Sequence, residues 1–78
     1  MVKIEILGTG CPNCRRLLAN VEQAVKELGI SAEIVKVEDI SEIVNRGVLF
    51  TPGLYVDGEA KSVGRVPPVE EIKRILRG

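Results

Sequence analysis

Apolar and polar side chains follow two different periods along the first half of the chain. Residues 2–7 and 32–37 alternate between the two kinds, as half-buried strands do. Between them, from Pro12 onward, apolar residues recur three and four positions apart, which predicts one long helix with a single apolar stripe. Gly29 fits the end of that helix. Because a full helix separates the two strands, we expect them to lie parallel.

The second half predicts four shorter elements. Asp39 and Ser41 are alternative caps for a short helix that extends to about Arg46. Residues 54–56 and 59–63 read as two strands joined by an Asp-Gly turn, so they should form an antiparallel hairpin. A last helix begins at two consecutive prolines and turns its apolar residues inward: Val69, Ile72, Ile75 and Leu76.

The resulting order is β-α-β-α-β-β-α, which predicts an α/β fold with a four-stranded mixed sheet flanked by three helices. The chain has 78 residues, and we expect one domain over residues 1–78. A domain of this size buries only about 60% of the surface that its unfolded chain exposes. With one Phe, one Tyr and no Trp, its core must be built from aliphatic side chains.

Charge and hydropathy narrow the possible functions. The chain has 11 basic and 11 acidic residues, so nothing attracts it to nucleic acid or to an acidic membrane surface. No stretch has the length of a membrane span, and the N-terminus lacks the pattern of a signal peptide. We therefore expect a cytoplasmic protein. It contains no His, so imidazole can serve neither as a base nor as a metal ligand.

The candidate chemistry lies in Cys11 and Cys14, which stand between a predicted strand and a predicted helix. In that setting a Cys-x-x-Cys pair indicates a redox-active dithiol. Pro12 suits the first helical position, which places Cys11 at the helix N-terminus. Free N–H groups and the helix dipole lower thiol pKa values there below the ordinary value of about 8.5.

The two cysteines should therefore differ in reactivity. Cys14 falls on the apolar stripe of the helix, so we expect it to be buried and less reactive than Cys11. We interpret Cys11 as the thiolate that attacks a substrate disulfide and Cys14 as the thiol that resolves the mixed disulfide. Pro12 stiffens the intervening loop, and Asn13 is expected to be exposed.

Three other interpretations are open. The cysteines could form a purely structural pair, although closing so short a loop stabilises a chain little. They could hold Cu(I) or zinc in a module like the small copper chaperones, which end on a strand. The chain could also be an interaction adaptor that kept the fold and lost the activity. A helix over residues 67–77 favours the oxidoreductase over the metal module.

The chain resembles a known family over essentially its whole length, and two segments match the motifs of that family. The segment from Gly10 to Cys14 and the segment that begins with Thr51-Pro52 resemble the thioredoxin/glutaredoxin superfamily, and most closely its small archaeal and bacterial redox-active disulfide proteins. The resemblance implies a minimal thioredoxin-like fold in which Pro52 is cis beside the sulfurs and Thr51 binds an extended substrate segment by strand addition. It also implies protein disulfide substrates, a thioredoxin-reductase-type electron donor, a monomer, and no cofactor or metal.

The chain departs from the family pattern at three places. Gly10 replaces the Trp that thioredoxins usually carry before the first cysteine. Thioredoxins also have a buried Asp as proton acceptor near the resolving cysteine; here Glu5 is the only acid in the first strand, and we expect it on the surface. Gly64-Arg65-Val66 stands where glutaredoxins have a glycine pair and an acid that bind glutathione, so we expect no such site.

Overall fold

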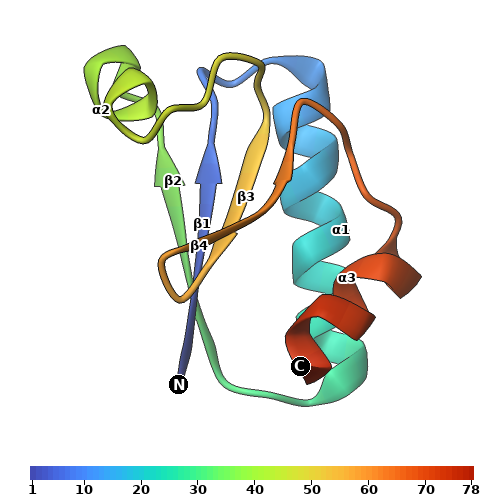
Figure 1. Ribbon diagram of the computed structural model, residues 1–78. Helices are drawn as coiled ribbons and strands as arrows, with labels where there is room; N and C mark the ends of the chain where they lie inside the picture. The colour runs from blue at the N-terminus through green and yellow to red at the C-terminus, as the bar shows by residue number, and fades with distance from the viewer.

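The seven elements appear in the predicted order in the computed structural model, which describes all 78 residues (Figure 1). Their bounds are β1 Val2–Leu7, α1 Pro12–Leu28, β2 Ala32–Val37, α2 Ile40–Asn45, β3 Gly53–Val56, β4 Glu59–Val63 and α3 Val69–Arg77. The strands lie side by side in the order β2-β1-β3-β4. β1 and β2 are parallel, and the other neighbours are antiparallel. The predicted α/β fold with a four-stranded mixed sheet is therefore confirmed.

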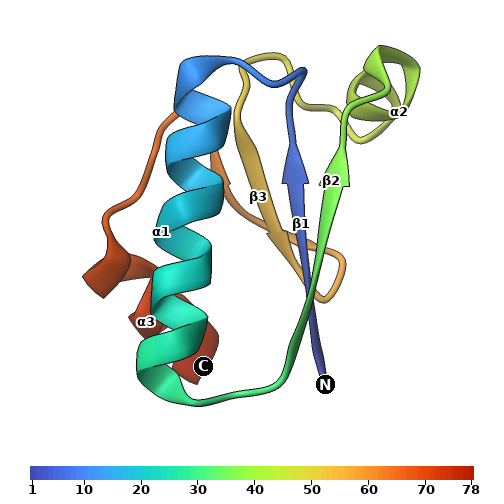
Figure 2. The same ribbon diagram turned by 180° about the vertical axis from the view of Figure 1, so that it is seen from behind.

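The helices are divided between the two faces of the sheet. Figures 1 and 2 show α1 and α3 together on one face, and α2 on the other, at the end of the sheet where β1 leads into α1. Because side chains alternate along a strand, β1 contributes to both faces. Ile4 and Ile6 join the larger core cluster with Leu17, Val21 and other residues of α1 and α3. Leu7 joins a smaller cluster that involves α2 and β3, with Ile43, Val48 and Tyr55.

Local signals explain where the helices begin and end. The Asp39 carboxylate accepts a hydrogen bond from the Ser41 N–H at 2.8 Å, so Asp39 is the cap of α2 and Ser41 lies within the helix. α1 ends at Gly29, whose φ of 64° is left-handed and suits glycine. None of the helices combines the length and apolar character needed to cross a membrane.

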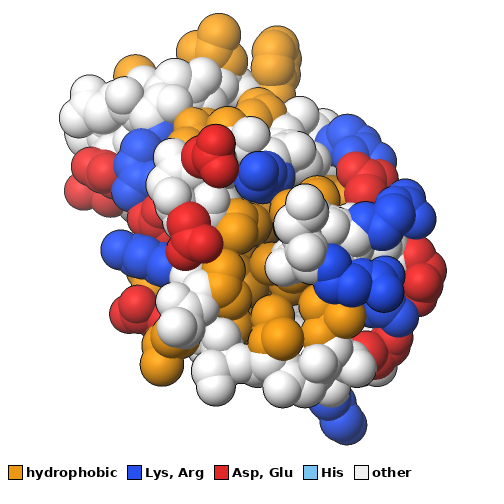
Figure 3. Space-filling model, turned by 60° about the horizontal axis from the view of Figure 1, so that its bottom comes forward, with side chains coloured by type: hydrophobic (Ala, Val, Ile, Leu, Met, Phe, Trp, Pro, Cys, Tyr) orange, Lys and Arg blue, Asp and Glu red, His pale blue; other side chains and the backbone are white.

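The larger core cluster comes close to the surface at the end of the molecule that holds both termini. Figure 3 brings this end forward and shows hydrophobic side chains gathered in the middle, with charged side chains on both sides. The partly buried apolar residues packed on that core include Val2, Val25, Ala32, Ile75 and Leu76. The cysteine pair lies at the other end, where α1 begins.

Candidate active site

The cysteine pair sits on the turn between β1 and α1, and backbone geometry fixes that turn. The Gly8 N–H donates a hydrogen bond to the Val37 carbonyl at 2.9 Å, which extends the pairing of β1 with β2 beyond the strand. Gly10 then takes a φ of 85°, a conformation that side-chain-bearing residues rarely adopt. Cys11 follows in extended conformation as the N-cap of α1, with Pro12 at the first helical position.

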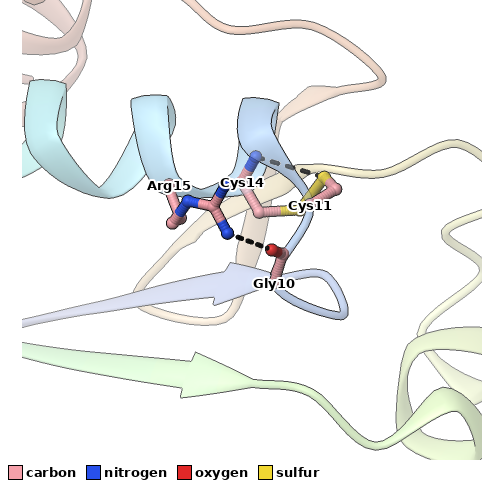
Figure 4. Close-up of a disulfide and its surroundings, with 4 residues drawn as sticks. All are labelled: Gly10, Cys11, Cys14 and Arg15. Carbon is pink, nitrogen blue, oxygen red and sulfur yellow. Dashed lines mark hydrogen bonds between the residues drawn. A yellow bond between two sulfur atoms is a disulfide. The ribbon is translucent and has the colours of Figure 1, made fainter.

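The two sulfurs are joined in a disulfide, and they are not equivalent. The Cα atoms of Cys11 and Cys14 are 5.0 Å apart, within the range that disulfides span. Cys11 Sγ accepts a hydrogen bond from the Cys14 N–H at 3.2 Å, as Figure 4 shows. Cys11 is partly exposed, whereas Cys14 is only 6% exposed. Pro12 and Asn13 between them are both exposed.

The loop before β3 approaches the sulfurs from the second half of the chain. A Cβ atom built on Gly8 would overlap Cys14 Sγ and would lie 3.7 Å from Thr51 Cβ, so Thr51 and Cys14 both lie against Gly8. The Thr51–Pro52 peptide bond is cis, and Pro52 is fully buried. Thr51 is exposed, and neither its N–H nor its carbonyl makes a backbone hydrogen bond. The structure thus leaves the backbone N–H and carbonyl of Thr51 without backbone partners, in a loop that lies close to the disulfide.

Glu5 is buried, which corrects the expectation that it lies on the surface. It is only 6% exposed, and its two carboxylate oxygens accept hydrogen bonds from Arg46 at 3.1 and 2.6 Å. The alternation along β1 turns this side chain to the face that carries α2, away from α1 and Cys14. The Tyr55 hydroxyl donates to the Arg46 carbonyl at 2.8 Å. Glu5 therefore ties α2 to the sheet through Arg46, the residue that ends α2.

This ion pair makes stability depend on pH. The hydrogen bonds from Arg46 hold the pKa of Glu5 below its ordinary value. A carboxyl group whose pKa is lower in the folded state than in the unfolded state stabilises the fold. For Glu5 this contribution is full at pH values above the unfolded-state pKa of about 4.3, and it is lost as the pH falls through the lower folded-state pKa. Glu5→Gln should reduce the free energy of unfolding by about 2 kcal/mol near neutral pH, because it removes charge-assisted hydrogen bonds. Urea unfolding near pH 7 and near pH 3 measures the effect.

Two results would contradict this account of Glu5. The difference between Glu5→Gln and the unmodified chain should shrink in the acidic series, because the stabilisation that comes from the lowered pKa of Glu5 falls as the pH drops below the unfolded-state pKa. A difference of equal size at both pH values would point to packing alone. Glu33→Gln is the matched control, because Glu33 is an exposed carboxylate of β2 without an ion pair in the structure. A loss equal to that of Glu5→Gln in this control would also remove the explanation.

A cavity of about 240 Å³ lies beside the disulfide, on the side of β2. Eight residues line it: Ile6, Gly8, Gly10, Cys14, Arg15, Leu18, Lys36 and Glu38. Among them is Cys14, the predicted resolving cysteine. Lys36 and Glu38, at the end of β2, are charged residues that the sequence analysis did not single out. Arg15 Nη1 donates a hydrogen bond to the Gly10 carbonyl at 3.0 Å, which places the guanidinium beside Cys14 (Figure 4). The ends of adjacent parallel strands meet at one edge of a sheet, and this rule could have pointed to Lys36 and Glu38.

Residues that could form a metal centre are not grouped in this structure: no three His, Cys, Asp or Glu side chains come together. The chain also ends on a helix, α3, which is the feature that distinguishes the oxidoreductase from the copper-chaperone layout. Arg65 makes a bidentate ion pair with Glu71 of this helix, at 2.7 and 2.8 Å, and so fixes the loop that precedes it.

A disulfide at the N-terminus of a helix, beside the Thr51–Pro52 loop at one end of a four-stranded mixed sheet, defines a thiol–disulfide oxidoreductase of the thioredoxin-like class. Comparison with known proteins gives the family. The sequence model of the thioredoxin domain family matches residues 2–77, and the chain therefore belongs to this family.

The curated relatives agree with this assignment. A thioredoxin of Methanothermobacter thermautotrophicus is 54% identical over 76 residues, which cover 97% of this chain and 99% of the relative. A thioredoxin of Methanocaldococcus jannaschii is 52% identical over 77 residues, which cover 99% and 88%. A probable thioredoxin of Methanothermobacter marburgensis is 29% identical over 76 residues, which cover 92% of this chain and 88% of that protein. The chain is a thiol–disulfide oxidoreductase.

Proposed function

We propose that the chain reduces or exchanges disulfides of protein substrates, with Cys11 as the nucleophile and Cys14 as the resolving thiol. The observation that carries this assignment is the difference between the two sulfurs. Cys11 is accessible and accepts the Cys14 N–H at the start of α1, whereas Cys14 is buried. Hydrogen-bond donors and the positive end of the helix stabilise a thiolate at Cys11 and offer no equivalent support to Cys14.

The reaction proceeds in two exchanges. The Cys11 thiolate attacks one sulfur of the substrate disulfide, and the other substrate sulfur leaves as a thiolate. The Cys14 thiolate then attacks Cys11 Sγ, forms the internal disulfide and releases the second substrate thiol. The gain of two electrons by the substrate equals the loss by the Cys11–Cys14 dithiol. An external dithiol donor, of the thioredoxin-reductase type, must reduce the pair again.

Thr51 and Pro52 are proposed to bind the substrate. The Thr51 peptide group is exposed and unpaired, so an extended substrate segment can add to it by backbone hydrogen bonds. Pro52 has no N–H, so no donor at that position competes for the thiolate. Gly10, Pro12 and Asn13 complete the loop around Cys11. In this proposal one chain, a single domain over residues 1–78, holds the whole site and acts as a monomer in the cytoplasm.

The reactivities of the two thiols test the assignment. In the reduced protein, Cys11 should be alkylated by iodoacetamide about tenfold faster than Cys14 near neutral pH, because it is accessible and its thiolate is stabilised. Peptide mapping by mass spectrometry after short reaction times gives both rates. In urea-unfolded protein the two rates should become similar, which serves as the matched control. Equal rates in the folded protein, or faster labelling of Cys14, would reverse the assigned roles.

A further inference from the structure

Two large apolar side chains are exposed directly before the peptide group that we propose to bind substrate. Leu49 is 80% exposed and Phe50 is 73% exposed, and Thr51 follows them in the chain. A single exposed apolar residue needs no explanation, but two large ones in sequence form a patch that a partner can cover. Phe50 is also the only Phe of the chain. The apolar pair Leu49 and Phe50 is therefore a candidate contact for whatever binds at Thr51.

The backbone holds Phe50 in place, although most of its side chain is exposed. A Cβ atom on Gly64 would lie 3.0 Å from Phe50 Cβ and 3.9 Å from Phe50 Cγ, so the base of this side chain packs over Gly64. The Gly64 N–H donates a hydrogen bond to the Pro52 carbonyl at 2.9 Å. Phe50 thus rests on the residue after β4, which is bonded to the loop that carries Thr51. A side chain fixed at its base loses little freedom when a partner covers it.

The apolar pair lies on one side of the reactive sulfur only. The loop before β3 and the turn between β1 and α1 lie together at the same end of the molecule (Figure 1). On the side of that turn, no large apolar side chain is exposed next to Cys11. Gly10, where the chain departs from the family pattern, has no side chain, and the exposed residues of the motif are Pro12 and Asn13. Any apolar part of a substrate therefore finds its contact at Leu49 and Phe50.

We propose that Leu49 and Phe50 select protein disulfides in which large apolar side chains lie on one flank of the target cysteine. The substrate segment adds to the Thr51 peptide group as a strand, and its side chains then alternate in direction. A side chain that turns toward the apolar pair leaves water together with the pair, which favours binding. Backbone pairing binds any extended segment, so the pair makes the choice among substrates. The inference rests on the proposed roles of Cys11 and Thr51.

Disulfide-linked dimers of a short peptide test this choice. Each peptide has one cysteine among glycines and serines, and three versions carry leucine at the two positions before the cysteine, leucine at the two positions after it, or serine at all four. Acid quenching followed by mass spectrometry gives the rate at which each dimer oxidises the reduced protein. One leucine peptide should react about tenfold faster than the serine peptide, the change that one well-buried interface side chain produces. The other leucine peptide should react like the serine peptide, because the pair lies on one side only.

The chain with both Leu49→Ser and Phe50→Ser should lose this preference. Its rates with the serine peptide and with hydroxyethyl disulfide, which has no flanking residues, should equal those of the unmodified chain. Ile30→Ser is the matched control, because Ile30 is an exposed apolar residue of the loop between α1 and β2, at the other end of the molecule (Figure 1). It should keep the full preference for the leucine peptide.

Three results would overturn the selection of substrates by the apolar pair. The first is equal rates with all three peptides, or equal acceleration by leucine on both flanks. The second is a preference that survives in the double variant. The third is a dimer in sedimentation that the double variant dissociates, because a second copy of this chain would then cover the pair. An unmodified chain that reacts with no disulfide, hydroxyethyl disulfide included, would instead overturn the proposed function.

Discussion

Replacing Cys11 by serine should abolish catalysed disulfide reduction, with a loss of a thousandfold or more. A serine hydroxyl stays protonated near neutral pH and cannot form a mixed disulfide, and Cys14 is buried and cannot replace the attacking sulfur. Reduction of insulin by dithiothreitol, followed by turbidity, gives the catalysed rate. The fold should persist, because Cys11 Sγ contributes a single hydrogen bond at the cap of α1.

Cys14→Ser is the matched control for Cys11→Ser. It keeps the attacking thiol, so it should react once with a disulfide and stop as a mixed disulfide at Cys11. Mass spectrometry should therefore show the protein plus one substrate thiol. Catalysis by Cys11→Ser at a rate near that of the unmodified chain would contradict the mechanism. The mechanism would also be contradicted if the Cys14 thiol that remains in Cys11→Ser formed a mixed disulfide as readily as the Cys11 thiol that remains in Cys14→Ser.

Gly8→Ala should raise the reduction potential of the cysteine pair, that is, make the disulfide easier to reduce. A Cβ at this position would overlap Cys14 Sγ and would lie 3.3 Å from Cys14 Cβ. In the disulfide the sulfur is held by its bond to Cys11, whereas in the dithiol the Cys14 side chain can turn away. Overpacking costs about 1–3 kcal/mol, so the shift should be about 20–65 mV, since about 30 mV corresponds to about 1.4 kcal/mol, a tenfold change in the redox equilibrium.

Equilibration with a series of dithiothreitol ratios, read by mass spectrometry after alkylation, gives this potential. The control is the pair of chains that carry Cys14→Ala, with and without Gly8→Ala. Removing the sulfur removes the overlap, so Gly8→Ala should cost less stability in that background than in the oxidised protein. An unchanged potential, or a shift to more negative values, would show that the Cys14 sulfur leaves room for a side chain at position 8 and that no overlap destabilises the disulfide.

The fold could be predicted from the sequence because local signals agreed with one another. The alternation over residues 2–7, the stripe of α1 and the turn at Asp57-Gly58 each favoured a single structure. The choice between Asp39 and Ser41 as cap stayed open, because both residue types suit that position. Only the folded loop shows that the Asp39 carboxylate faces the Ser41 N–H.

The site was predictable only in part. The Cys-x-x-Cys pair and the Thr51-Pro52 segment carry short motifs, so both could be found without a structure. Glu5 was misplaced because exposure of a single Glu was inferred from what is usual for that residue type, and its partner Arg46 is 41 positions away. Gly8 carries no motif. Its importance comes from its closeness to Cys14 Sγ, which depends on how α1 packs on β1.

The most direct test of the central claim follows a single turnover of the reduced protein with insulin. Mass spectrometry with peptide mapping, after rapid acid quenching and alkylation, identifies every bond that forms. The mechanism predicts first a mixed disulfide between insulin and Cys11, and then free insulin thiols together with a chain that is lighter by two hydrogens and carries the Cys11–Cys14 bond. Insulin that is reduced without formation of that bond, or that first becomes attached to Cys14, would contradict it.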